Sequence, residues 1–181
     1  TLAMKGGAYV YYFENYVSKN SLSDFISPII DFLSSIGINF FGSDPVSAGF
    51  GLFNAGGIIF MIIGIGLSKM LADKYGKRTV FGVFLFISTL FILVFYVLSP
   101  DSINLIFGAQ IFHGFFYGIT IPLLWAMIAD VADYSEWKNN RRATAIIFSA
   151  MMVGLKLGLS IGGALVAVSY THLRAHETSI D

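Results

Sequence analysis

The chain has 181 residues, of which 56% are hydrophobic and 12% are charged, and its formal net charge at pH 7 is zero. Soluble domains carry about 25% charged residues, so this composition excludes an ordinary soluble domain and indicates an all-α integral membrane protein. Nucleic-acid binding is excluded because the basic residues do not gather into one dense patch. The absence of cysteine excludes disulfides and thiolate metal sites.

The first apolar segment, residues 2–17, is interpreted as the remnant of a first membrane span, because the chain opens inside it. Its side chains Lys5, Tyr9, Tyr12 and Tyr16 lie at spacings of four, three and four residues, which places them on one helical face. Two interpretations carry about equal weight. The tyrosines form an aromatic belt at the membrane interface, or they form the wall of a substrate pathway, because tyrosine offers both a ring face and a hydroxyl.

A long connection follows over residues 18–44. Ser27 can cap a short helix that has Pro28 at its first position and Gly37 just past its end. We expect this helix to lie at the membrane surface. A packed loop is the alternative.

Four further segments are apolar over the roughly 20 residues that a bilayer span requires. They are residues 46–67, 79–98, 103–129 and 143–168, which gives five spans in all. The first of the four is rich in glycine and has Asn54 as its one strongly polar interior residue, and the second is expected to face lipid. The loops 69–78 and 130–142 hold four and three Lys or Arg residues, whereas the turn 99–102 holds none. The positive-inside rule therefore places these two basic loops in the cytoplasm.

Three hydrogen-bonding side chains share one face of segment 103–129. Gln110, His113 and Tyr117 lie within about 80° of one another at 100° per residue, and lipid cannot satisfy such groups. A lone histidine in a helix is more often a structural group, but three polar groups on one arc favour the lining of a pathway. Pro122 should loosen this helix one turn earlier, near Gly118. No second histidine or carboxylate lies at metal-ligand spacing, so no metal site is predicted.

Segment 143–168 carries one charge, Lys156, near its middle. A lysine at mid-bilayer costs ~2.5–3.5 kcal/mol on insertion scales, so it should face a polar partner or a water-filled path. Gly154, Gly158 and Gly162 form a small-residue stripe that would admit another helix. Lys156 lies about 200° from that stripe. The residues predicted to share its face are Ser149, Met152, Ser160 and Gly163.

The connection 130–142 has a distinct order of charges. Its acids are Asp130, Asp133 and Glu136, and its bases, which follow, are Lys138, Arg141 and Arg142. Bases at the start of a helix oppose its dipole, and the nearby carboxylates can offset that cost. We hypothesise that such ion pairs close the cytoplasmic side of a carrier in one of its states. The alternative is a solvated loop whose bases only set the topology. The spacing of Asp130 and Asp133 also occurs in Mg²⁺ enzymes, but no catalytic motif accompanies it, so no enzyme is predicted.

Three stretches carry a resemblance to a known family. The loop KMLADKYGKR resembles the major facilitator signature, with Asp73, Gly76, Lys77 and Arg78 in matching places. The stretch AMIADVADYSEWKNNRRATAIIFSAMMVGLKLGLSIGGAL resembles the region of the tenth and eleventh helices of the glycoside–pentoside–hexuronide:cation symporters. The opening MKGGAYVYYFENYV is similar to their seventh helix.

This resemblance implies that the chain holds helices seven to eleven of a twelve-helix major facilitator fold, without the N-terminal six-helix half. It implies cation-coupled symport of a small sugar by alternating access in a bacterial inner membrane. Na⁺ or H⁺ is the expected coupling cation, and no other cofactor is expected. Lys156 matches a lysine that is implicated in coupling in that family. The candidate pathway residues are Lys156, Gln110, His113, Tyr117, Tyr9, Tyr12, Asn54, Ser149 and Ser160. The alternatives are a carrier of a non-sugar solute, such as a lysolipid or a peptide, and a non-transporting membrane scaffold.

The last segment, residues 169–181, reads SYTHLRAHETSID and is polar where a short outer loop and a twelfth span should follow. It resembles a translated sequencing adapter, and we expect it to be non-native. His172 and His176 are therefore left out of the candidate sites. A genuine outer loop is the alternative.

Overall fold

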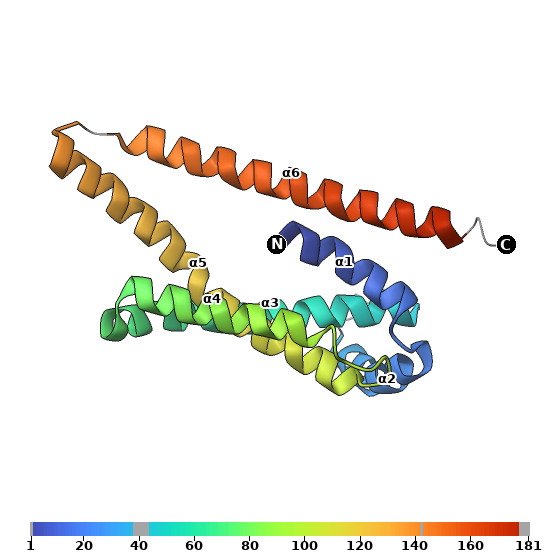
Figure 1. Cartoon of the computed structure of the whole chain (residues 1–181). Coiled ribbons are helices and arrows are strands. Elements are labelled where there is room, and N and C mark those ends of the chain that lie inside the picture. The colour runs from blue at the N-terminus through green and yellow to red at the C-terminus, as the bar shows by residue number, and fades with distance from the viewer. Residues whose placement is uncertain (1, 38–43, 142, 178–181) are drawn as a thin grey trace. The chain divides into compact units, whose positions relative to one another are not determined.

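Six helices make up the described part of the chain. The computed structural model describes residues 2–37, 44–141 and 143–177 (Figure 1). The helices are α1 (Leu2–Asn15), α2 (Lys19–Ser35), α3 (Pro45–Tyr75), α4 (Lys77–Val94), α5 (Ile103–Asn139) and α6 (Thr144–Glu177). They fall into two units, one of residues 1–16 with 132–181 and one of residues 17–131, and each unit is described by itself.

Four of these helices, α3 to α6, are long and apolar enough to cross a membrane. Helix α1 has 14 residues, which is about 21 Å at 1.5 Å per residue and falls short of a hydrocarbon core of about 30 Å. The all-helical membrane class is therefore confirmed. The count of five spans is wrong for the described residues, because the first predicted span is too short in this chain.

Two helices continue through segments that were predicted to be loops. Helix α3 runs on to Tyr75 and α5 to Asn139, so residues 69–75 and 130–139 are helical. A helix need not end where the hydrocarbon ends, and each of these helices stops only at a residue with positive φ, Gly76 (83°) or Asn140 (49°). Lys138 consequently lies in the last turn of α5. The expectation that it opposes a helix dipole is wrong, because a cation in the last turn is favourable.

Helix α2 begins earlier than predicted, at Lys19, and contains Pro28 in its interior. Ser27 is not its cap, because the Ser27 hydroxyl donates a hydrogen bond back to the Asp24 carbonyl at 3.4 Å within the helix. The predicted end is correct, since Gly37 follows the helix with φ of 84°. Whether α2 lies at a membrane surface stays a prediction.

The entry to α2 is fixed by the turn that joins α4 to α5. The Ser18 amide donates to the Pro100 carbonyl at 3.3 Å, and the Ser21 hydroxyl donates to the Asp101 carboxylate at 3.2 Å. The turn itself closes with the expected bond from the fourth residue to the first, at 3.0 Å. These bonds join three segments at the end of the unit that the charge pattern places outside the cell.

Helix α3 begins with a capped first turn. The Asp44 carboxylate accepts hydrogen bonds from the Ser47 hydroxyl at 2.7 Å and the Ser47 amide at 2.9 Å, and Pro45 occupies the first helical position. These bonds, together with weaker contributions from the Val46 amide and the Lys19 charge, hold the pKa of Asp44 below its usual value of 3.8. Asp44 is therefore ionised at neutral pH and stabilises the N-terminus of the helix.

Glycines bring α3 and α5 into direct backbone contact. A Cβ atom added at any of three glycines would collide with a carbonyl oxygen of the other helix. The pairs are Gly114 with Gly57, Gly118 with Met61, and Gly64 with Phe115. Glycine lets two backbones approach this closely because it has no side chain. The α3–α5 pair is thus the tightest helix contact of the unit.

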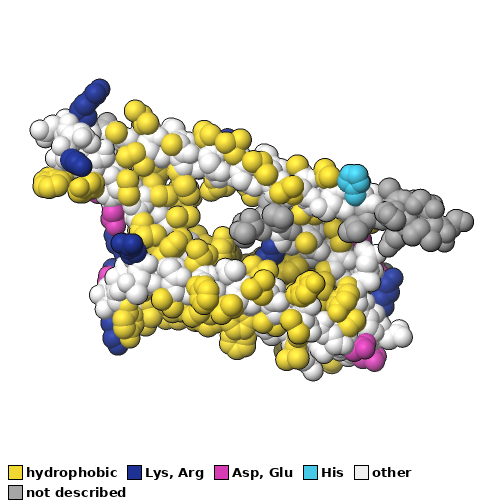
Figure 2. All heavy atoms as spheres, viewed as in Figure 1, with side chains coloured by type: hydrophobic (Ala, Val, Ile, Leu, Met, Phe, Trp, Pro, Cys, Tyr) yellow, Lys and Arg dark blue, Asp and Glu magenta, His cyan; other side chains and the backbone are white. Residues whose placement is uncertain are grey.

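Helix α4 packs on α5 through its first turn. Val80 of α4 is buried with Ile119 and Leu123 of α5. The rest of α4 is mostly exposed and apolar, with Phe86 and Leu93 at 65% and 60% exposure, and Figure 2 shows hydrophobic side chains over its visible face. That α4 faces lipid stays a prediction.

In the other unit, α1 packs on α6 in parallel (Figure 1). The Tyr11 and Tyr170 rings stack with centroids 3.7 Å apart, and one turn earlier a Cβ at Gly7 would lie 3.1 Å from the Val166 side chain. Both contacts join a residue to the one 159 positions later, so the two helices run in the same direction. This agrees with the predicted topology, in which both run outward. The backbone stays helical to Glu177, and the origin of segment 169–181 stays a prediction.

Candidate substrate pathway

The polar stripe of α5 lies partly against its neighbours, since Gln110 meets Gly57 of α3 and His113 meets the Ser88 carbonyl of α4. The seam where α5 meets these helices is centred on Phe115 and Ile119, which approach Gly64 of α3, while Ile119 also packs on Val80 of α4. Tyr117 lies two residues from both, which is about 200° around the helix. Tyr117 therefore lies away from this seam, whereas Gln110 and His113 of the same stripe contact α3 and α4.

Three members of this stripe are buried. Gln110, His113 and Thr120 are 6%, 3% and 2% exposed, and Tyr117 is half-buried. The Thr120 hydroxyl donates to the Tyr117 carbonyl at 2.7 Å, so it is satisfied within its own helix. Hydrogen-bonding groups held out of lipid in this way fit the lining of a pathway better than a lipid-facing surface.

His113 joins α5 to α4. Its Nδ1 atom lies 2.9 Å from the Ser88 carbonyl oxygen of α4, and its ring stacks on that of Tyr117 with centroids 5.7 Å apart and an interplanar angle of 14°. The bond to the Ser88 carbonyl is therefore the kind of structural contact that is expected of a lone histidine. The contact to Tyr117 also connects it to the predicted pathway.

The Gln110 amide sits against the bare backbone of Gly57, where an added Cβ would lie 2.7 Å from its nitrogen. Its Oε1 atom is buried and accepts no hydrogen bond from any residue that the structure describes. Such a group costs about 1–3 kcal/mol when unsatisfied, so Gln110 has a strong requirement for a donor such as water or a ligand hydroxyl. Asn54, by contrast, donates to the Phe50 carbonyl at 2.9 Å within α3.

The tyrosines of α1 form a second aromatic group. Tyr9 is buried, and the Lys5 ammonium lies 5.1 Å from its ring centroid. Tyr12 is half-buried, with its ring 5.0 Å from that of Tyr16. The contacts fit both an interfacial belt and a pathway wall, so both interpretations stand.

Lys156 lies exposed on α6, together with Ser149 and Ser160. One end of the predicted packing stripe is covered and the other is open. Gly162 is buried, whereas added Cβ atoms at Gly154 and Gly158 would meet no described atom within 4 Å. The first half of α6 thus presents Gly154, Gly158 and Lys156 on surface that the described residues leave open.

The cytoplasmic ion pair differs from the predicted one. The Lys77 ammonium lies 2.7 and 2.8 Å from the two carboxylate oxygens of Asp130, with the side chains 44% and 54% exposed. Lys77 opens α4 directly after the left-handed Gly76, which turns the chain toward α5. The expected partners of Asp130, within its own connection, are therefore corrected to Lys77. The remaining predicted residues Asp73, Arg78, Asp133 and Arg141 are exposed, and Arg142 lies outside the described residues.

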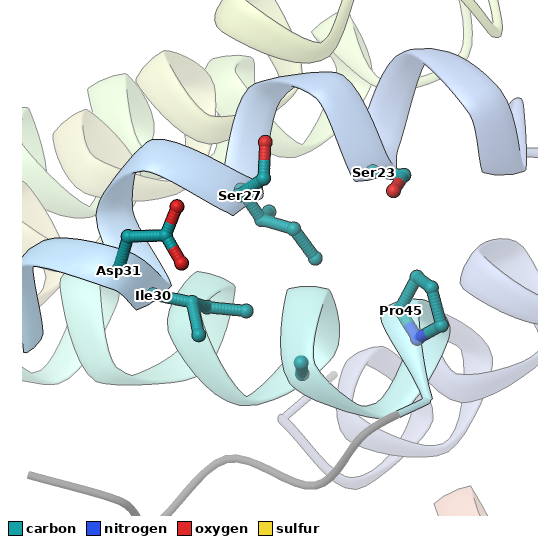
Figure 3. Close-up of a pocket in the computed structure, with 7 residues that line it drawn as sticks. Ser23, Ser27, Ile30, Asp31 and Pro45 are labelled. Carbon is teal, nitrogen blue, oxygen red and sulfur yellow. The ribbon is translucent and has the colours of Figure 1, made fainter. Parts of the chain in front are cut away.

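A shallow groove of about 190 Å³ lies between α2 and the start of α3 (Figure 3). Ser23, Ser27 and Asp31 of α2 line one side of it, and Pro45 lies opposite. It is open and belongs to the predicted outer surface. It therefore adds nothing to the pathway on α5.

Two contacts of the site were missed in the sequence. The partner of His113 is a backbone carbonyl, which leaves no mark in a sequence. The α3–α5 contact did leave one, because Gly57 and Gly64 are seven residues apart and Gly114 and Gly118 four apart, each pair on one helical face. Among the described residues, no group of His, Asp or Glu could hold a metal ion.

Comparison with known proteins assigns this set of helices. The family model described as MFS/sugar transport protein matches residues 32–173. The chain belongs to this family. Its members are transporters and not enzymes, which together with the four apolar helices makes the chain part of a multi-pass membrane protein.

Individual relatives agree with the family. The chain is 36% identical over 99 residues to the putative glycoside/cation symporter YagG of Escherichia coli (strain K12), covering 55% of this chain and 22% of that protein. It is 35% identical over 106 residues to the inner membrane symporter YicJ of the same organism, covering 58% and 23%. It is 41% identical over 51 residues to the isoprimeverose transporter of Lactiplantibacillus pentosus, covering 28% and 11%. The chain thus spans less than a quarter of each of these relatives. No solved structure matches it.

Proposed function

We propose that this chain is part of a cation-coupled sugar symporter of a bacterial inner membrane. The observation that carries the proposal is the buried polar stripe of α5, in which the Gln110 amide oxygen has no hydrogen-bond donor among the described residues. It is supported by the similarity to the putative glycoside/cation symporter YagG and to the isoprimeverose transporter. In such carriers two halves rock about a site near the midplane of the membrane.

The stripe has the chemistry that a sugar requires. Sugar hydroxyls donate and accept hydrogen bonds, and the apolar faces of sugar rings pack on aromatic rings. The buried amide oxygen of Gln110 has no hydrogen-bond donor among the described residues. Tyr117 offers a half-buried ring and hydroxyl. Tyr9 and Tyr12 of α1, which belong to the other unit, offer rings and hydroxyls of the same chemistry.

Lys156 is assigned the electrostatic part of coupling. A cation at mid-membrane stabilises nearby carboxylates in their charged form and competes with a bound ion for them. Those carboxylates would come from parts of the carrier outside this chain. Na⁺ and H⁺ are both compatible with this role.

The Lys77–Asp130 pair has the structural role of holding α4 against α5, and it is not the cytoplasmic gate. It joins two helices whose buried residues Val80 and Ile119 already pack together, so both partners move with the same unit. An exposed pair of this kind contributes about 0–1 kcal/mol. The hypothesis of a cytoplasmic gate therefore rests on Asp133, Arg141 and Arg142.

Uptake into membrane vesicles tests the proposal. Vesicles that contain the full-length carrier should accumulate a labelled glycoside, pentoside or hexuronide above equilibrium when a Na⁺ or proton gradient is imposed. Lys156→Ala should insert normally and lose this accumulation, whereas Lys74→Ala, in the predicted cytoplasmic segment, should keep it. Uptake that ignores every gradient would overturn coupling, and normal accumulation by Lys156→Ala would leave that residue a structural role.

A further inference from the structure

The buried contact between His113 and the Ser88 carbonyl is a strong anchor. Both residues are almost fully enclosed, at 3% and 1% exposure, and the 2.9 Å distance from Nδ1 to the oxygen is that of a good hydrogen bond. A backbone carbonyl can only accept. The Nδ1 atom of His113 must therefore carry the proton, which fixes one tautomer of the neutral ring.

The anchor fixes the orientation of the imidazole plane. A histidine ring has two side-chain torsions, and a directed bond from one nitrogen to a helix backbone restrains both of them. The oxygen belongs to α4 and not to the helix that carries the ring. The orientation of the His113 ring is therefore set by α4 as well as by α5, the helix that carries it.

Tyr117 lies one turn further along α5, with its ring 14° from parallel to that of His113 and 5.7 Å away. Residues four apart on a helix are neighbours on its surface. Offset, nearly parallel rings of this kind attract one another beyond the effect of the area they bury. A fixed His113 ring therefore limits the rotamers open to Tyr117.

We infer that His113 is a positioning residue, which holds the Tyr117 ring at the angle that meets the sugar. This inference rests on the proposed function, in which Tyr117 contacts the substrate. His113 itself need not touch the sugar. To fill this role, the side chain at position 113 needs a hydrogen-bond donor directed at α4 and a flat ring that stacks on Tyr117.

Two substitutions separate these requirements. His113→Asn keeps an N–H near the position of Nδ1 but removes the ring, and His113→Phe keeps a flat ring but removes the donor. Both should raise the KM for sugar several-fold while the maximal rate of uptake changes little, because the substrate is held less well and the transport cycle is intact. Ser88→Ala is the matched control, since the Ser88 hydroxyl bonds only within α4, to Leu85, and the carbonyl remains.

A double-mutant cycle with Tyr117→Ala decides the question. The KM increase caused by His113→Phe should disappear when Tyr117 is already alanine, because no ring is left to position. If His113→Phe raises KM equally in both backgrounds, His113 does not act through Tyr117 and the inference is overturned. If Tyr117→Ala alone leaves KM unchanged while uptake remains coupled, the inference fails and the symport proposal survives. If no gradient drives uptake in the unmodified carrier, the proposed function itself fails.

Discussion

Gly118→Ala probes the contact between α3 and α5 at the point where it is closest. The added methyl group would collide with the Met61 carbonyl oxygen. That oxygen belongs to a helix backbone, so only a shift of one whole helix can relieve the collision. Forced overpacking of this kind costs about 1–3 kcal/mol.

Gly108→Ala, on the same helix, isolates the cost. A Cβ at Gly108 meets no described atom within 4 Å, so this variant gains only the helix propensity of alanine over glycine, about 0.8–1.0 kcal/mol. The same gain applies at Gly118 and cancels in the comparison. The two variants should therefore differ by about 1–3 kcal/mol, with Gly118→Ala the less stable.

Gly57→Ala should fall between them. Its methyl group would meet the Gln110 amide at 2.7 Å and occupy space next to Gly114. The end of a glutamine side chain can swing aside, which a backbone cannot do. The expected order of stability is therefore Gly108→Ala, then Gly57→Ala, then Gly118→Ala.

The assay is thermal unfolding of the purified full-length carrier in one detergent. Gly118→Ala should melt below Gly108→Ala, by less per kcal/mol than the roughly 2–4 °C expected for a domain of 150–250 residues, because the full-length carrier is larger. Equal melting temperatures for the two variants would refute the direct α3–α5 contact. So would a Gly118→Ala variant that is more stable than the unmodified protein.

Three further predictions follow from the loops and helix ends. Cysteine placed at Ser99 should react with an impermeant thiol reagent in intact cells, and cysteine at Lys74 only after lysis; the reverse would invert the topology. Asp130→Asn should lower stability by no more than ~1 kcal/mol. Exchange of the charges at Lys77 and Asp130 should restore part of the loss in a thermal-unfolding cycle. No recovery would show that this ion pair does not stabilise the contact between α4 and α5. Because hydrogen bonds hold the pKa of Asp44 below 3.8, its stabilisation is present at neutral pH and is lost as the pH falls below that value. The melting difference between the unmodified protein and Asp44→Ala should therefore shrink in acid, and a constant difference would contradict the cap.

Hydropathy predicted the long apolar helices of this fold because the bilayer imposes their length and composition. It could not predict where α3 and α5 end, since both continue past the apolar stretch until a residue adopts positive φ. It overestimated the first span for a related reason. Residues 2–17 are apolar, but the helix within them closes at Asn15.

The candidate site could likewise be predicted only in part from the sequence. The shared face of Gln110, His113 and Tyr117 follows from helical periodicity and was predictable. The bond from His113 to the Ser88 carbonyl was not, because every residue has a carbonyl and only the placement of α4 selects one. Nor was the partner of Asp130, because Lys77 is 53 residues away along the chain. Contacts between helices depend on register and rotation, which local patterns do not contain.

The parallel pairing of α1 with α6 sets the order in which this part of the protein can assemble. Gly7 meets Val166, 159 positions later in the chain. At a synthesis rate of about 5–20 residues per second, the ribosome needs roughly 8–32 s to deliver that partner. Helix α1 is made before the other described helices, yet it must wait in the membrane for α6 until α2 to α5 have been made. During that interval its bare Gly7 surface is open to other helices of the nascent chain, or to a membrane chaperone.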